Sequence, residues 1–176
     1  GQANGSTPYN RGGGMHNYGG SPTLVNVVFT GNYAAANGGG MYTYYGSPSL
    51  TNVTFNGNYA SGGGGMYNHN NSSVDLTGVT FWNNTAQSGG GVVNDTSSNS
   101  VLVDVLFADN TATGNGGALY NYESSPTLTD THFTGNDAGA LGGAVYNHYS
   151  AFTLSEATLS GKMATFKRLM DRVANK

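Results

Sequence analysis

Three acidic residues are the first candidates for chemistry because they recur at a constant interval. Asp104, Asp130 and Glu156 lie 26 residues apart each time. If that interval is one structural repeat, their carboxylates lie about 5 Å apart, a separation at which they raise one another's pKa, attract a cation or suit a retaining glycosidase. The alternative is that each acid replaces an asparagine at a backbone bend. We favour the bend, because acids level with a corner leave no cleft for a sugar.

The histidines do not form a metal or catalytic set. His69 and His148 share a position in the repeat but lie three repeats apart, about 14 Å, which is too far for one zinc ion. No Ser-His-Asp set, phosphate-binding loop, cysteine nucleophile or calcium-binding nonapeptide is visible. Lyase chemistry of the pectate-lyase type also needs basic residues beside its acids, and residues 1–161 contain only Arg11. We therefore predict no catalytic residue, no metal and no cofactor.

Tyrosine is the strongest functional signal. The outward positions of one predicted strand hold mostly Tyr and His, which offer flat rings with polar tips for stacking on sugars or packing against a protein. The alternative is a tyrosine ladder that only stabilises the strand. Val93 and Asp95 interrupt this face, so a long ligand would meet a gap there. The predicted binding residues are Tyr18, Tyr42, Tyr44, Tyr67, His69, Tyr120, Tyr122, Tyr146 and His148.

An internal repeat of 26 residues must position these side chains. One apolar column keeps this step without exception: Leu24, Leu50, Leu76, Leu102, Leu128 and Leu154. A second column contains Phe29, Phe55, Phe81, Phe107, Phe133 and Leu159. A polar column contains Asn32, Asn58, Asn84, Asn110 and Asn136. A further apolar column drifts by one residue within the turns: Met15, Met41, Met66, Val92, Leu119 and Val145.

The repeat predicts an all-β fold, a single parallel β-helix of about six coils. Apolar residues recur mostly at every second position, which indicates short strands and disfavours helical repeats. A unit of this size has no core of its own and is stabilised by stacking on the next. Glycines supply tight corners, and the third glycine of each triplet needs smallness more than positive φ, since Ala118 and Ala144 replace it. The Asn32 column predicts a buried amide ladder, and the column at Asn26, Asn52, Gly78, Asp104, Asp130 and Glu156 predicts a second bend.

Two recurring motifs resemble the repeats of the polymorphic outer-membrane protein family. They are "FTGN", "FNGN", "FWNN" and "FADN" (F-x-x-N), and "GGGM", "GGGV", "GGAL" and "GGAV" (G-G-A followed by Ile, Leu or Val), and they cover residues 12–161. The wider similarity is to right-handed parallel β-helix proteins. The resemblance implies a secreted or surface-displayed bacterial passenger domain, adhesins among them. The same helix also carries enzymes similar to pectate lyases and polygalacturonases.

The two ends of the chain differ. We predict a β-helix over residues 1–161, in which residues 1–11 form a degraded half-coil that aligns Ala3 with the phenylalanine column. Residues 162–176 have apolar residues at helical spacing and are predicted to form an amphipathic α-helix that caps the last coil. Because an uncapped coil exposes unpaired strand edges, the N-terminal end is the predicted site of end-to-end assembly.

Charge and composition exclude several functions. Residues 1–161 hold one basic and eight acidic residues, a formal charge of −7, which opposes nucleic-acid binding. The absence of cysteine excludes disulfides, and no apolar run is long enough to span a membrane. We predict a non-catalytic structural or adhesive module, extracellular or on the surface of a bacterial or archaeal cell, that binds a polysaccharide or a surface protein and assembles into fibres. The alternative is a polysaccharide-active enzyme.

Overall fold

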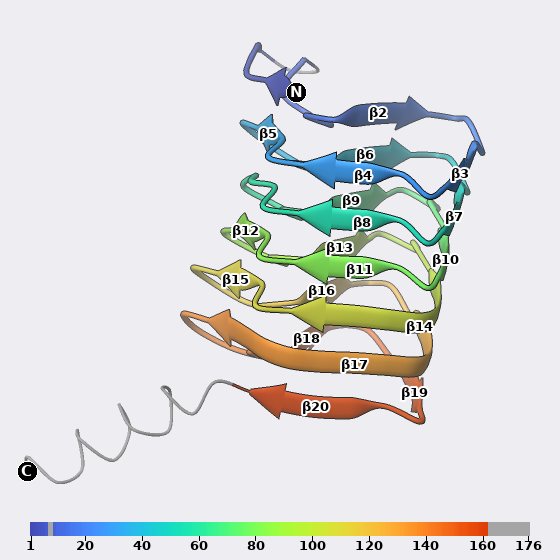
Figure 1. The fold of residues 1–176 in the computed structure, drawn as a ribbon, viewed down its shortest axis with the longest axis vertical. Helices are drawn as coiled ribbons and strands as arrows, with labels where there is room; N and C mark the ends of the chain where they lie inside the picture. Colours follow the sequence, from blue (N-terminus) through green and yellow to red (C-terminus); the bar gives the residue numbers. More distant parts are fainter. Residues whose placement is uncertain (7–8, 162–176) are drawn as a thin grey trace, which may run out of the picture.

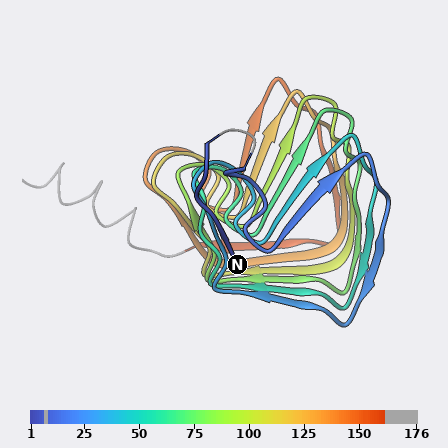
Figure 2. The ribbon, with the colours of Figure 1, turned by 90° about the horizontal axis from the view of Figure 1, so that it is seen from above.

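The chain folds into a right-handed parallel β-helix (Figure 1). The computed structural model describes residues 1–6 and 9–161. Strands of successive coils pair in parallel, and Figure 2 shows the coils superposed around one axis. The predicted class and the number of coils are confirmed.

Two sheets form the long walls of the helix. The six-stranded sheet has one strand from each coil: β2 (Met15–Tyr18), β6 (Met41–Tyr44), β9 (Met66–His69), β13 (Val92–Asp95), β16 (Leu119–Tyr122) and β18 (Val145–His148). The twelve-stranded sheet contains β3 (Thr23–Val25), β4 (Val28–Thr30), β7 (Ser49–Thr51), β8 (Thr54–Asn56), β10 (Asp75–Thr77), β11 (Thr80–Trp82), β12 (Thr85–Ala86), β14 (Val101–Ala108), β15 (Thr111–Ala112), β17 (Thr127–Ala138), β19 (Thr153–Ser155) and β20 (Thr158–Gly161). The short strands β1 (Gln2–Ala3) and β5 (Tyr33–Ala34) pair with each other beside these walls.

The strand register confirms that 26 residues make one coil. Each leucine of the Leu24 column pairs with the leucine of the next coil. The five phenylalanines stack with ring centroids 4.8 to 4.9 Å apart and interplanar angles of 2 to 9°. The drifting column also pairs as predicted, from Met15 to Val145. These columns form one continuous core inside the coils.

The backbone bends at the positions that the sequence predicts. All six residues of the Asn26 column have a positive φ, between 48° and 62°. The three acids of that column are exposed at this bend, so their interpretation as bend residues is confirmed. The third glycine of the triplet does not have a positive φ, but a Cβ added at Gly65 would lie 2.8 Å from the ring of Phe81. Smallness is therefore the constraint at this position.

The predicted asparagine ladder is present. The amide of Asn84 donates to Asn110 Oδ1 at 3.0 Å and to the carbonyl oxygen of Phe55 at 2.9 Å. Its Oδ1 accepts from the backbone N–H and the amide of Asn58. The left-handed residue is the one before each asparagine, for example Asn83 with φ 55°, so the ladder and the turn occupy neighbouring positions.

Two further polar ladders were not predicted. Inside the six-stranded sheet, the amides of Asn68, Asn94, Asn121 and Asn147 bond in sequence at 2.8 to 3.0 Å. This ladder is interrupted at Thr43, where Thr43 Oγ1 and Asn68 Oδ1 are buried without a hydrogen-bond partner. At the corner after this sheet, the hydroxyls of Ser72, Ser98, Ser124 and Ser150 accept backbone N–H groups of the preceding coil.

The first half-coil pairs differently from the prediction. Ala3 pairs with Ala34 and not with the phenylalanine column, so the predicted alignment of the first half-coil was wrong by five residues. The alignment failed because this segment carries none of the repeated side chains. The predicted capping helix over 162–176 lies outside the described residues.

Candidate functional site

The predicted aromatic residues lie on the outer surface of the six-stranded sheet, in two neighbouring columns. Strand pairing places His16, Tyr42, Tyr67, Val93, Tyr120 and Tyr146 in the first column. It places Tyr18, Tyr44, His69, Asp95, Tyr122 and His148 in the second. All nine predicted residues therefore belong to one face, because alternate residues of each strand point outward.

Stacking divides this face into two aromatic groups. In the first group, the rings of Tyr18 and Tyr44 stack with centroids 5.4 Å apart, and Tyr44 meets His69 edge-on at 5.3 Å. In the second group, Tyr120 stacks on Tyr146 at 5.3 Å, and Tyr122 meets His148 edge-on at 5.2 Å. The coil that carries Val93 and Asp95 separates the two groups.

The exposure of these rings varies widely. Tyr18 is 75 % exposed, whereas Tyr42 is only 1 % exposed. The guanidinium of Arg11 lies 5.2 Å above the Tyr42 ring and Nη1 donates to its hydroxyl at 3.4 Å, while His16 packs edge-on at 5.1 Å. In this structure Tyr42 thus supports the face from beneath and is out of a ligand's reach.

Asp95 is a polar centre that the sequence analysis treated only as a gap. Its Oδ2 accepts a hydrogen bond of 2.6 Å from the Tyr67 hydroxyl and lies 3.6 Å from His69 Nε2. Its Oδ1 accepts a bond from Thr96. His69 Nδ1 lies 3.1 Å from the Tyr42 hydroxyl. One network therefore connects three coils through unlike side chains.

The electrostatics of this network keep its rings uncharged at neutral pH. Burial raises the pKa of Tyr67, and the hydrogen bond to Asp95 raises it further. Burial also lowers the pKa of His69, with Arg11 acting in the same direction and Asp95 in the opposite one. Since a neutral imidazole bears one N–H, we assign it to Nε2, facing Asp95, so that Nδ1 accepts from Tyr42.

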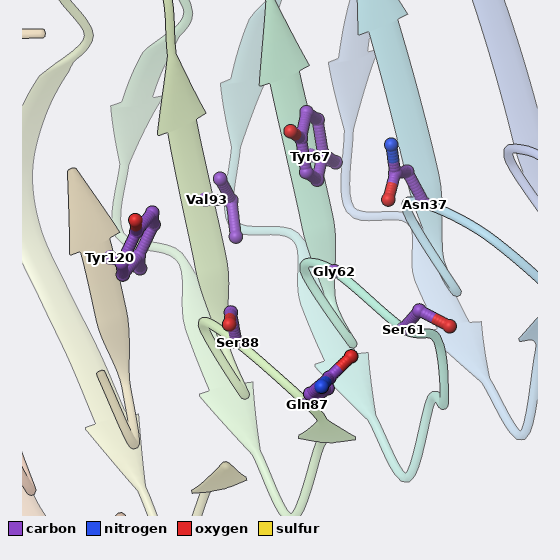
Figure 3. Close-up of a pocket in the computed structure, with 8 residues that line it drawn as sticks. All are labelled: Asn37, Ser61, Gly62, Tyr67, Gln87, Ser88, Val93 and Tyr120. Atoms are coloured by element: carbon purple, nitrogen blue, oxygen red, sulfur yellow. The ribbon is translucent and has the colours of Figure 1, made fainter. Parts of the chain in front are cut away.

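An open hollow lies beside this network, with a volume of about 260 Å³. Figure 3 shows Val93 between Tyr67 and Tyr120, with the polar residues on the neighbouring turns. The residues that line the hollow are Asn37, Ser61, Gly62, Tyr67, Gln87, Ser88, Val93 and Tyr120.

The fold and the repeat agree with a comparison against known families. The family described as "Right handed beta helix region" matches residues 3–159. The chain belongs to this right-handed β-helix family. Searches of curated proteins and of solved structures returned no significant match. Family membership shows the fold of this β-helix.

Two aromatic residues of the β-helix were missed by the sequence analysis. Tyr45 and Tyr149 occupy equivalent corner positions with φ values of 54° and 52°, and they are 52 % and 79 % exposed. Their rings lie 4.5 Å from Tyr44 and 4.4 Å from His148. The two tyrosines are separated by four whole repeats, and this regular spacing in the sequence could have identified them. Each extends one aromatic group around the corner of the sheet.

The other candidates of the sequence analysis lie elsewhere on the β-helix. Asp104, Asp130 and Glu156 are at exposed bends, and His132 lies on β17 of the twelve-stranded sheet. Within residues 1–6 and 9–161, no group of three or more His, Asp or Glu side chains is placed to hold a metal ion. In the same part of the chain, no helix is long and apolar enough to cross a membrane.

Proposed function

We propose that this β-helix is a non-catalytic binding module of an extracellular or cell-surface protein, and that it binds a glycan on the aromatic face of the six-stranded sheet. The observation that carries this proposal is the pair of stacked aromatic groups, whose rings repeat at about the spacing of the coils. Tyr18 in the first group and Tyr149 beside the second are exposed, and in the first group His69 is hydrogen-bonded to Tyr42.

The physical reason is preorganisation. The rings project from strands that pair with the strands of neighbouring coils, and rings of successive coils stack on one another. Little side-chain freedom therefore remains to be lost on binding. Tyrosine presents an apolar ring face together with a hydroxyl, which matches the apolar face and hydroxyl groups of a sugar ring.

The surface location rests on the motif resemblance. The F-x-x-N and G-G-A repeats resemble those of the polymorphic outer-membrane proteins, and that likeness supports a secreted or surface-displayed bacterial or archaeal module. A protein partner on the same face remains the alternative ligand.

A glycan array tests the proposal with matched variants. We expect the wild type to bind glycans and Tyr44→Ala/Tyr122→Ala to lose that binding. The control is Tyr33→Ala/Tyr59→Ala, because these exposed tyrosines also stack, at 5.6 Å, but lie outside the six-stranded sheet. Equal loss in both double variants, or no loss in the first, would remove the proposal.

A second candidate is a polysaccharide-active enzyme. One observation favours it: Asp95, His69 and Tyr67 bring a carboxylate, an imidazole and a phenol together on a partly exposed surface. This candidate predicts new reducing ends or unsaturated products from polysaccharides, lost in Asp95→Asn and kept in Asp130→Asn at the exposed bend. If no such products form, the enzyme candidate is excluded for the substrates tried.

End-to-end assembly is a further proposal for the N-terminal edge. Among the described residues, β2, β3 and β4 each pair with a strand on one side only. Unpaired parallel edges accept another strand. Electron microscopy at high protein concentration tests this, with filaments as the expected result and only short particles as the contrary one.

A further inference from the structure

The hollow on the aromatic face results from one residue. Val93 stands where the preceding coil has Tyr67 and the following coil has Tyr120. Two coil steps place these tyrosine positions about 10 Å apart along the axis. Val93 is 2 % exposed and forms the floor. The missing side chain therefore leaves the room that one more ring would occupy in the column.

The rim of the hollow offers hydrogen-bonding groups that the protein itself does not use. Asn37, Gln87 and Ser88 are partly or fully exposed, and within the described residues their side chains have no hydrogen-bond partner. The hydroxyl of Ser61 donates to the carbonyl oxygen of Ala35 and keeps its acceptor capacity. Amide and hydroxyl groups at the rim of an apolar floor suit a ligand that has both ring faces and hydroxyls.

One wall of the hollow is held in place. The Tyr67 hydroxyl is bonded to Asp95, and the Tyr67 ring lies against the backbone at Gly62, where an added Cβ would be 2.8 Å from a ring carbon. The equivalent turn positions in the flanking coils are Asn37 and Ser88. Glycine at position 62 thus makes room for the ring that forms this wall.

The charges around the hollow select against anions. None of its lining residues is charged. The carboxylate of Asp95 contributes to the raised pKa of both Tyr67 and Tyr120, so its negative field reaches both walls, and the guanidinium of Arg11 opposes it at Tyr67. Residues 1–161 also have a strongly negative formal charge. An acidic sugar would be repelled, whereas an uncharged sugar would not.

We propose that the hollow is a subsite for one uncharged sugar ring of a glycan, with Tyr67 and Tyr120 as walls, Val93 as floor and the rim amides and hydroxyls as hydrogen-bonding partners. Asp95 acts as a positioning residue through Tyr67. The inference rests on the proposed function, because the rest of the glycan lies along the aromatic groups on either side.

Calorimetric titration with defined hexasaccharides tests the subsite. The probes are the uncharged hexamers of β-1,4-glucose, β-1,3-glucose, β-1,4-mannose, β-1,4-xylose and N-acetylglucosamine, and the acidic hexamer of galacturonate. The test variant is Val93→Tyr, which fills the hollow with the side chain found in both flanking coils. The matched control is Val103→Tyr, which adds the same side chain at an exposed valine of β14 in the twelve-stranded sheet. We expect at least one uncharged hexamer to bind, and Val93→Tyr to weaken it at least about tenfold while Val103→Tyr does not.

A second variant guards against misfolding of the first. Gln87→Ala removes an exposed rim amide without touching the core, and we expect it to weaken the same hexamer about threefold. Thermal unfolding of each variant confirms that the β-helix is intact.

The outcomes separate this inference from the proposed function. Binding that is lost in Tyr44→Ala/Tyr122→Ala but unchanged in Val93→Tyr and Gln87→Ala would overturn the subsite and leave the aromatic face as the binding site. Galacturonate hexamer binding as tightly as the best uncharged hexamer would overturn the selection against anions. Binding to none of the hexamers, together with a blank glycan array, would overturn both.

Discussion

The inner asparagine column from Asn32 to Asn136 and the outer aromatic columns both repeat once in each coil, but they are built differently. Inside, every member is an asparagine, and the amides of Asn32, Asn58, Asn84 and Asn110 each donate to the asparagine of the next coil. Outside, Tyr67 bonds to Asp95 and Tyr42 to His69, so the partners are unlike and lie diagonally in the next coil.

The difference follows from access to water. A buried amide must find all its partners in the protein, and another asparagine one coil away provides both a donor and an acceptor. Most side chains of the outer columns are at least partly exposed and can bond to water, so these columns tolerate changes of residue type such as Val93 and Asp95. The inner column therefore stabilises the coils, and the outer columns are free to vary and to form a binding site.

The largest expected effect is on the inner column. Asn84→Ala removes a side chain that takes part in four buried hydrogen bonds, and it leaves the N–H of Asn58 and the carbonyl of Phe55 without those partners. We expect a loss of about 3 to 5 kcal/mol in the free energy of unfolding, measured in urea. The neighbouring variant Asn83→Gly is the control, because Gly31, Gly57 and Gly135 occupy this turn position in other coils. A similar loss in both variants would contradict the ladder's role.

A smaller effect is expected where an inner ladder is interrupted. Thr43→Asn places an amide opposite the unpaired Asn68 Oδ1 and should raise the free energy of unfolding by about 1 to 2 kcal/mol. Thr43→Val is the matched control, since it removes the buried hydroxyl without providing a hydrogen-bond donor to Asn68 Oδ1. If valine stabilises as much as asparagine, the gain comes from removing the hydroxyl and not from completing the ladder.

The outer network should respond more weakly. Asp95→Asn removes the charge and weakens the bond from Tyr67, so we expect the pKa of Tyr67 to fall toward that of free tyrosine and stability to drop by about 1 kcal/mol. Ultraviolet titration of the phenols and urea unfolding measure the two effects. In a double-mutant cycle with Tyr67→Phe, additive losses would show that the two residues are not coupled.

The smallest effect is a pH dependence of stability. The pKa of His69 is lowered from 6.5 by burial and by Arg11, so the unfolded chain binds a proton more readily than the folded one. Stability is thus full above pH 6.5 and decreases as the pH falls toward the folded pKa. His16 shifts in the same direction through burial and Arg11. We expect the thermal unfolding temperature to be slightly lower at about pH 5.5 than at about pH 7.5, and this difference to be smaller in His69→Gln.

Several parts of the candidate site followed from the sequence. The nine predicted aromatic residues lie on one face because the inward positions of Met41 and Met66 set the phase of their strands. The contact of Tyr42 with Arg11 joins residues that are 31 apart and do not share a position in the repeat. Asp95 departs from the aromatic column, so the sequence indicated only an interruption there and not its bond with Tyr67. Because neither contact repeats from coil to coil, neither was predicted.

The sequence by itself determined the length of each coil, the register of its strands and the side chains that point inward. The physical reason is translational symmetry: when identical residues stack on identical residues, the interval between them is the period of the structure. The tertiary structure alone decided which outer side chains touch, that Tyr42 is buried, and that Val93 forms the floor of a hollow. These depend on side-chain directions and on the turns packed beside the sheet, which differ from coil to coil and leave no regular mark in the sequence.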